Sequence, residues 1–268
     1  MTIALIDNGS LEPDAHRNLR AVALGISQLT GETVHAVSWK HSSRIPGALL
    51  DGLPADTLVP WIKRLRLRGE REFLFVPFFI SDQGAIGSAL RVDLEKLQAS
   101  EGAFEYAFTD SLATTGALIE IAAERIKAAA GHLDRSAVIV VDHGGPSAAS
   151  AALRDRTAGI LRSALGDSVR GLAAASMEGG DYPHNRPLLA DQLRAPGFDT
   201  GRVVIAPLFL SPGRHAGPDG DLRQITRAAE AASPGLTCTF AELIGTHPLA
   251  TQALAHSLRQ SLRLPSIL

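Results

Sequence analysis

Cysteine is nearly missing from this 268-residue sequence, in which Cys238 is the only one. A single cysteine excludes an intrachain disulfide framework and any cysteine-rich zinc or iron–sulfur site, and it fits a reducing compartment. An excess of one charge is missing too, since 26 Lys and Arg stand against 28 Asp and Glu. The sequence therefore argues against a nucleic-acid-binding protein with a broad basic face, and anion binding has to come from local arginines.

Long hydrophobic runs are also absent. No apolar run approaches the roughly 18 residues that a membrane span needs, and the first residues, MTIALIDNGS, lack the basic and apolar regions of a secretory signal. We therefore expect a soluble, cytoplasmic protein without a membrane partner. Three glycine-containing motifs are missing, which argues against dinucleotide, P-loop and α/β-hydrolase sites. They are G-x-G-x-x-G after the first strand of either half, G-x-x-x-x-G-K-[ST] and G-x-S-x-G.

What the sequence does contain is a duplication. Asp-Asn-Gly at 7–9 matches Asp-His-Gly at 142–144 at an offset of 135 positions, and Pro77 matches Pro207 at an offset of 130. A third match joins residues 107–126 to 239–258 at about the same spacing. Three matches in one order predict two similar halves, residues 1–134 and 135–268.

Each half alternates short apolar runs with helical patterns. Runs such as VIVV, VVIA and FLFV are typical of parallel strands that are buried on both faces. The pattern predicts an α/β fold of two tandem, similar, doubly wound domains, each a mainly parallel four-stranded sheet flanked by helices. We expect strands near 2–7, 33–38, 72–78, 104–108, 137–142, 170–175, 202–209 and 236–241, and helices near 13–29, 56–68, 86–99, 114–129, 147–166, 186–195, 217–232 and 248–262.

Two histidines follow strands of the second half. His143 follows the strand expected near 137–142, and His215 stands in the loop after the strand near 202–209. Ligands bind beyond the carboxyl ends of parallel strands, so both side chains are expected at the ligand-binding edge of one sheet, facing a cleft between the lobes. Imidazole binds iron, cobalt, nickel or zinc and exchanges protons near neutral pH. A hydrogen bond that only caps a strand end is the alternative role for a single histidine.

Several charged residues belong to the same predicted edge. Glu178 follows the second strand of that half and could hold a cation or take a proton, or be a solvated loop carboxylate. Asp219 and Asp221 either lie near a metal or serve as acids of a first helical turn. Five basic residues lie in or beside strand-end loops: Lys40, Arg44, Arg91, Arg186 and Arg214. Each alone is expected to be a solvated surface residue, but together they could bind the carboxylates of an acidic ligand.

The DHGG element followed by PSAASAAL, together with PLFLSPGRHAGPDGDL at 207–222, resembles the sirohydrochlorin chelatase family, the CbiX/SirB-type class II chelatases. The resemblance covers essentially the whole chain, because the family has long members with two tandem halves. It implies a lyase-type enzyme that inserts Fe²⁺ or Co²⁺ into sirohydrochlorin or a related tetrapyrrole, for sirohaem or cobalamin synthesis. The divalent metal (Fe²⁺, Co²⁺ or Ni²⁺) is then a substrate, and no cofactor is permanently bound.

The resemblance also implies roles for individual residues. His143 and His215 become metal ligands and catalytic residues, with Glu178 as a further catalytic residue. The first half departs from the pattern, since Asn8 stands where the family has its first histidine and residues 77–94 contain none. We expect that half to contribute to tetrapyrrole binding. The predicted substrate-binding residues are Asn8, Ser10, Arg44, Arg186 and Arg214.

Other functions remain open at this stage. The protein could bind or deliver a tetrapyrrole or its metal without catalysing insertion, or it could be a two-lobed sensor of a small acidic metabolite. The sensor leaves the histidine pair unexplained. We expect a monomer or homodimer.

Overall fold

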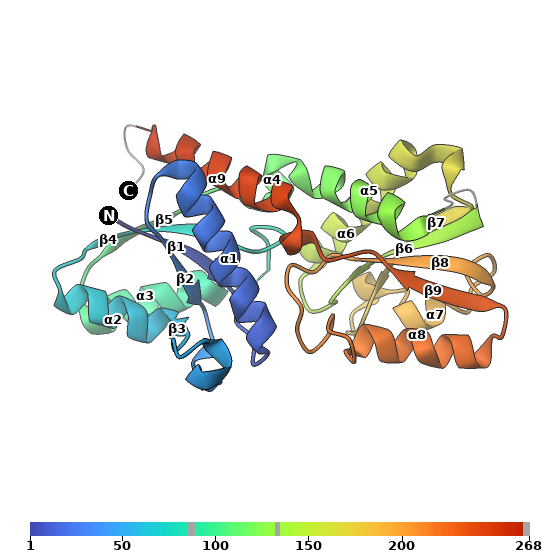
Figure 1. The fold of residues 1–268 in the computed structure, drawn as a ribbon, viewed down its shortest axis with the longest axis horizontal. Helices are drawn as coiled ribbons and strands as arrows, with labels where there is room; N and C mark the ends of the chain where they lie inside the picture. The colour runs from blue at the N-terminus through green and yellow to red at the C-terminus, as the bar shows by residue number, and fades with distance from the viewer. Residues whose placement is uncertain (85–88, 132–134, 265–268) are drawn as a thin grey trace. The chain divides into compact units, whose positions relative to one another are not determined.

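A computed structural model describes residues 1–84, 89–131 and 135–264 of the chain. These residues form two compact units, one made of Met1–Ala117 with Gly245–Leu268 and the other of Leu118–Ile244. Each unit contains one parallel sheet with helices packed on it, which confirms the predicted α/β class (Figure 1). No helix in the described ranges is both long and apolar enough to cross a membrane.

The sheet of the first unit has the strand order β3-β2-β1-β4-β5, and all its pairs are parallel. It has one strand more than predicted, the two-residue β3 at the start of the region expected to be helical. Its strands are β1 (Thr2–Asp7), β2 (Val34–Ser38), β3 (Asp56–Thr57), β4 (Glu72–Pro77) and β5 (Glu105–Phe108). Its helices are α1 (Pro13–Thr30), α2 (Leu58–Leu67), α3 (Arg91–Glu101), α4 (Leu112–Thr115) and α9 (Pro248–Leu262).

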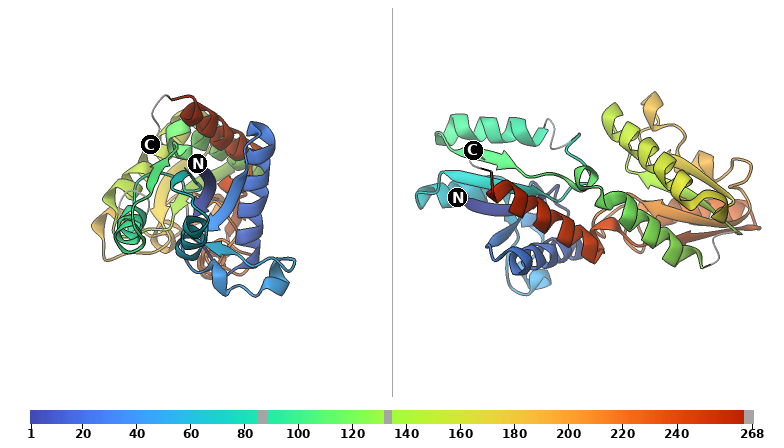
Figure 2. Two further views of the ribbon diagram at one scale, coloured as in Figure 1. Left: turned by 90° about the vertical axis from the view of Figure 1, so that its left-hand side faces the viewer. Right: turned by 90° about the horizontal axis from the view of Figure 1, so that it is seen from above.

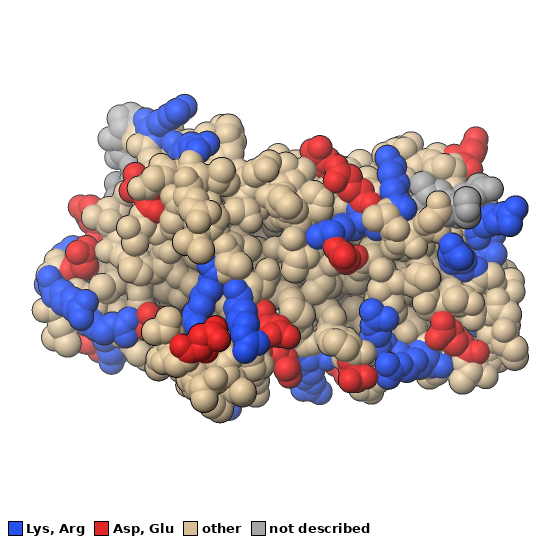
Figure 3. Space-filling view, viewed as in Figure 1, with Lys and Arg blue, Asp and Glu red and all other residues tan. Residues whose placement is uncertain are grey.

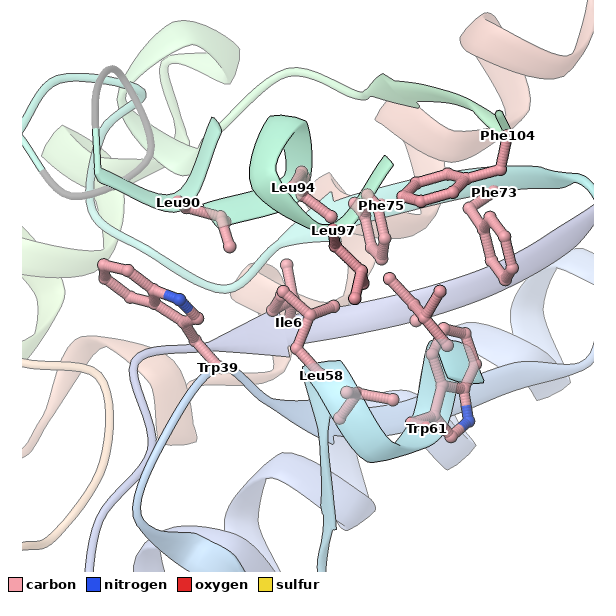
Figure 4. Close-up of a cluster of buried hydrophobic side chains, with 13 residues drawn as sticks. Ile6, Trp39, Leu58, Trp61, Phe73, Phe75, Leu90, Leu94, Leu97 and Phe104 are labelled. Atoms are coloured by element: carbon pink, nitrogen blue, oxygen red, sulfur yellow. The ribbon is translucent and has the colours of Figure 1, made fainter. Parts of the chain in front are cut away.

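The core of the first unit is rich in aromatic side chains. Trp61 of α2 packs against Phe73 of β4, with ring centroids 5.7 Å apart, and Phe73 meets Phe104 edge to face at 5.5 Å. Figure 4 shows these rings between the sheet and the two helices α2 and α3, with Ile6 of β1 among them. Leu5, which points to the opposite face of β1, is also fully buried. The strand is therefore covered on both faces, as its continuous apolar run predicts.

The sheet of the second unit has the order β7-β6-β8-β9 and is also entirely parallel. Its strands are β6 (Ser136–Asp142), β7 (Gly171–Ser176), β8 (Gly201–Pro207) and β9 (Leu236–Phe240). Its helices are α5 (Ala117–Ala130), α6 (Ala148–Leu165), α7 (Leu189–Gln192) and α8 (Asp221–Ala232). The five residues Ala137 to Val141 of β6 are all fully buried, so this central strand is covered on both faces as well.

The last helix of each sequence half belongs to the unit of the other half. From its second residue on, α5 is part of the second unit, whereas α9 is part of the first. There α9 lies beside α1, where Gly25 leaves room for Thr251, as the red and blue helices in Figures 1 and 2 show. The compact units thus do not coincide with the predicted halves 1–134 and 135–268. That the two halves are copies of one repeat stays a prediction.

The predicted element positions hold apart from local differences around glycine and proline. The helix expected at 114–129 is divided into α4 and α5 by Gly116, whose φ of +78° ends the first segment. The helix expected at 217–232 begins only at Asp221, because Gly217 and Gly220 form a turn ahead of it. The helix expected at 186–195 shrinks to the single turn of α7, which follows Pro187. Part of the start expected at 86–99 lies outside the described residues.

Candidate metal centre

Two strand-end loops of the second unit pack against each other and position the candidate site. The end of β6 pairs with the end of β7, where Asp142 lies opposite Ser176. Beyond these ends the Glu178 amide donates a 3.1 Å hydrogen bond to the His143 carbonyl. Gly144 has a φ of +83°, and a Cβ there would lie only 2.1 Å from the Glu178 carbonyl oxygen. The DHGG sequence therefore needs glycine at this position, since any side chain would push the two loops apart.

A buried arginine fixes the strand ends beneath these loops. Arg154 of α6 is 1% exposed, and its guanidinium contacts Asp142 at 3.4 Å and Asp155 at 2.8 Å. It also donates to the Ser176 hydroxyl and, at 3.0 Å, to the His184 carbonyl. The Ser176 hydroxyl donates in turn to Asp142 at 2.6 Å. The charge of Arg154 is paired and its donors are used, as a buried guanidinium requires.

The sequence contained a signal for Arg154 that we did not use. It stands on the buried stripe of α6 that includes Ala151, Ala158, Leu161 and Leu165, at the spacing of three and four residues that faces a core. A charged residue on such a stripe needs buried partners, and its partners here are the ends of β6 and β7. The structure shows this support, which the loop residues alone did not indicate.

The structure brings the two predicted histidines together. The Nε2 atoms of His143 and His215 lie 3.3 Å apart, the ring centroids are 4.6 Å apart, and the ring planes are nearly perpendicular at 89°. The side chain of His143 is 46% exposed and that of His215 is 28% exposed, so a ligand can reach both. The pair is therefore neither sealed in the core nor splayed apart.

The hydrogen bonds of the two rings define which nitrogen can bind a cation. His143 Nδ1 lies 2.8 Å from the Gly144 carbonyl, and His215 Nδ1 lies 2.6 Å from Asp221 Oδ2. Both partners are acceptors, so each Nδ1 carries the proton and each Nε2 presents its lone pair. Two nitrogens that bind one ion at about 2.1 Å, with an angle of about 90–110° between them, are about 3.0–3.4 Å apart. The observed spacing matches such a pair of neighbouring ligands on one divalent ion.

Glu178 lies beside the pair. Its Oε1 is 3.5 Å from His143 Nε2, and its side chain is 56% exposed. No group of three or more His, Cys, Asp or Glu side chains is arranged to hold a metal ion in the parts of the chain that the structure describes. The candidate centre therefore consists of two imidazole ligands with a carboxylate next to them. A set of two strong ligands leaves coordination positions open for a second molecule.

The basic residues predicted to bind substrate are distributed over both units. Arg214 lies 3.9 Å from Asp221 and is 81% exposed, which places it next to the histidine pair. Arg186 pairs with Asp191 at 3.2 Å. Arg44 belongs to the first unit, where it donates to His41 Nδ1 at 2.8 Å. Lys/Arg and Asp/Glu side chains are mixed in small groups on the face drawn in Figure 3.

Asn8 and Ser10, also predicted to bind substrate, lie in the loop after β1 of the first unit. The Asn8 carbonyl accepts a 3.2 Å hydrogen bond from the Lys40 amide, and the Ser10 amide donates to the Ser42 hydroxyl at 3.1 Å. Within the second unit, Arg214 shares the partner Asp221 with His215, which places it beside the histidine pair. The roles of all five stay predictions.

Comparison with known proteins identifies a matching family model and matching folds. The CbiX family model matches residues 137–261, the segment that carries both histidines. SirB from Bacillus subtilis with Fe³⁺ has a TM-score of 0.69 and 12% identity over 97% of this chain and 95% of its own. SirB from Bacillus subtilis subspecies spizizenii in complex with cobalt has a TM-score of 0.66 and 14% identity, again over 97% of this chain and 95% of its own. CbiX, described as the terminal enzyme of sirohaem biosynthesis in denitrifying bacteria, has a TM-score of 0.62 and 17% identity. The match covers 97% of this chain and 99% of that protein.

The two-unit α/β fold is thus similar to the fold of SirB and CbiX. Residues 137–261 match CbiX, and this confirms the resemblance to the sirohydrochlorin chelatase family that the sequence indicated. No curated protein matches the sequence.

Proposed function

We propose that this protein is a chelatase that inserts a divalent metal, Fe²⁺ or Co²⁺, into sirohydrochlorin or a closely related reduced tetrapyrrole. The observation that supports it best is the 3.3 Å separation of the Nε2 atoms of His143 and His215. This spacing suits one divalent ion held by two ligands, and the fold is similar to that of SirB structures containing Fe³⁺ or cobalt. The proposal includes a cytoplasmic setting.

The chemistry required matches the side chains present. Metal insertion delivers a partly dehydrated cation and removes two pyrrole N–H protons. The neutral imidazoles of His143 and His215 bind the incoming cation while leaving positions for the macrocycle nitrogens. Glu178, whose carboxylate lies 3.5 Å from His143 Nε2, accepts one of the two protons, and an imidazole that has released the cation accepts the other. With only two strong protein ligands, the metal can pass to the four nitrogens of the macrocycle.

The test is an insertion assay with sirohydrochlorin and Fe²⁺, Co²⁺ or Ni²⁺ in parallel, followed by the visible spectrum against buffer without protein. We expect His143→Ala and His215→Ala to lower the insertion rate at least about 100-fold, because removal of a metal ligand or base costs roughly that much. Glu178→Gln should lower kcat more than metal affinity. Circular dichroism checks that each variant is folded.

Two outcomes would contradict the proposal. If the parent binds metal and tetrapyrrole but inserts no faster than buffer, the protein is a binding or delivery protein. If the parent inserts metal and both histidine variants do so at the same rate, insertion takes place at another site.

A further inference from the structure

The first unit repeats the backbone of the candidate metal centre with different side chains. In the second unit the Glu178 amide donates to the His143 carbonyl at 3.1 Å. In the first unit the Lys40 amide donates to the Asn8 carbonyl at 3.2 Å, again between the second residue after one strand and the first residue after its neighbour. Lys40 therefore takes the place of Glu178, just as Asn8 takes the place of His143.

The glycines between these positions confirm the equivalence. Gly9 has a φ of +84° and Gly144 a φ of +83°. A Cβ on Gly9 would lie 1.7 Å from the Lys40 carbonyl oxygen, and a Cβ on Gly144 would lie 2.1 Å from that of Glu178. The two loops meet in the same way in both units. The exchange of Glu178 for Lys40 is thus a reversal of charge at one position of a shared frame.

The Lys40 ammonium is held in place by an aromatic ring and one carboxylate among the residues that the structure describes. Its Nζ lies 3.9 Å from the centroid of the Trp39 ring and 3.2 Å from Asp93 Oδ2. That carboxylate oxygen also accepts from Trp39 Nε1 at 3.1 Å, so it is shared between two donors. An ammonium has three N–H donors, and Lys40 is 47% exposed. It can donate to a further acceptor without losing its contact with Asp93.

We propose that this edge of the first unit is an anion site, in which Lys40 binds a carboxylate group of a tetrapyrrole, in contrast to the equivalent edge of the second unit with its candidate metal ligands. The first unit has the cation of Lys40 where the second has the acid Glu178. It has the amide of Asn8 where the second has the candidate metal ligand His143. A divalent cation is repelled by this ammonium, whereas a carboxylate is attracted to it. The choice of a tetrapyrrole carboxylate rests on the proposed function; the sign of the ligand rests on Lys40 alone.

The experiment titrates the full chain with uroporphyrin I, a metal-free macrocycle that carries eight carboxylates, and follows binding by calorimetry in low salt. Lys40→Glu is the main variant, and Lys40→Ala avoids repulsion of Asp93 should the first variant unfold. Lys63→Glu is the matched control, because Lys63 is 48% exposed and forms a similar ion pair with Glu101 at 2.7 Å. Co²⁺ binding is measured on every variant.

We expect Lys40→Ala to weaken uroporphyrin binding about 10-fold, in line with the loss of one charge-assisted hydrogen bond, and Lys40→Glu to weaken it further. Lys63→Glu should bind as the parent does, and Co²⁺ affinity should stay unchanged in all three variants. The inference is wrong if the parent does not bind uroporphyrin, if both Lys40 variants bind it like the parent, or if Lys63→Glu loses as much. Failure of the proposed function gives a different result: no metal insertion by the parent, with the Lys40 effect still present.

Discussion

At the residue scale, Asp221 is the side chain that orients the candidate ligand His215. Its carboxylate lies 2.6 Å from His215 Nδ1, while the corresponding atom of His143 meets only the Gly144 carbonyl. A carboxylate partner makes an imidazole a stronger ligand than a carbonyl partner does. His215 is therefore expected to hold the cation more firmly, and His143 to release it first.

Asp221→Asn should lower the affinity for Co²⁺ about 10- to 100-fold, the usual effect of losing such a partner. Asp221→Glu should restore part of it, because a carboxylate is again available. Titration followed by the visible absorption of Co²⁺ measures both. Asp219→Asn is the control, since the Asp219 carboxylate contacts only exposed Arg227, at 3.4 Å. Equal losses in the Asp219 and Asp221 variants would remove the positioning role.

Asp7 and Asp142 occupy equivalent strand ends but differ in their surroundings. Asp142 is paired with buried Arg154, whereas burial raises the pKa of Asp7 to about 6, against the opposing effect of hydrogen bonds from Ser38 and Gly9. A raised pKa in the folded state means that Asp7 adds stability below about pH 4, and that this contribution is lost as the pH rises through 6.

Asp7→Asn should therefore raise the free energy of unfolding by about 2–3 kcal/mol at pH 7.5 and by almost nothing at pH 4. Asp142→Asn should act in the opposite direction, costing about 3 kcal/mol, because it leaves the charge of Arg154 undercompensated. Urea unfolding at both pH values measures the two variants against the parent. Destabilisation of the protein by Asp7→Asn at pH 7.5 would contradict this assignment. Burial also lowers the pKa of His16 to about 4.

At the scale of elements, the loop Asp142–Gly145 shows what the sequence could and could not predict. The apolar runs and the Asp-x-Gly repeat correctly predicted the strands and placed His143 and His215 at one sheet edge. They could not predict that the two Nε2 atoms face each other, because this depends on Gly144, Asp221 and buried Arg154 together. Similarly, the break between α4 and α5 depends on the conformation of Gly116 in a region with helical periodicity on both sides.

Gly144→Ala tests the contact between the two strand-end loops. Its Cβ would clash with the Glu178 carbonyl oxygen, and its φ of +83° disfavours any residue but glycine. We expect a loss of about 2 kcal/mol or more in unfolding free energy, together with weaker Co²⁺ binding. Gly159→Ala is the control, because Gly159 lies within α6 and no atom is within 4 Å of an added Cβ. This substitution should stabilise the protein by about 0.5–1 kcal/mol. Thermal unfolding measures both, and unchanged Co²⁺ binding in Gly144→Ala would show that the loop contact does not position the ligands.

At the scale of the whole molecule, the sequence predicted two similar halves but not that the last helix of each half belongs to the unit of the other half. Periodicity shows that 248–262 is an amphipathic helix, and its neighbours in the sequence place it in the second half. Which sheet it covers depends on the packing of α1 against α9, including the Gly25–Thr251 contact, and no local pattern encodes this. The boundary expected at residue 134 consequently differs from the division into compact units.

Removal of residues 245–268 should unfold the first unit selectively. It takes away Leu254 and Leu258 of α9, which are fully buried against that unit. Both candidate metal ligands lie within Leu118–Ile244, so we expect the shortened chain to lose one thermal transition and keep Co²⁺ binding within about 3-fold of the parent. Calorimetry and Co²⁺ titration measure this. A single transition with both properties lost would show that the two units fold only together.

The crossing of α5 and α9 also constrains how such a gene can change. A split at codon 134 would give two polypeptides, and neither would contain a complete unit. The first would carry α5 of the second unit, and the second would carry α9 of the first unit. They would be obliged to associate in order to fold. The first half of the sequence therefore contributes to the unit that carries His143 and His215, because its terminal helix α5 belongs to that unit from Leu118 on.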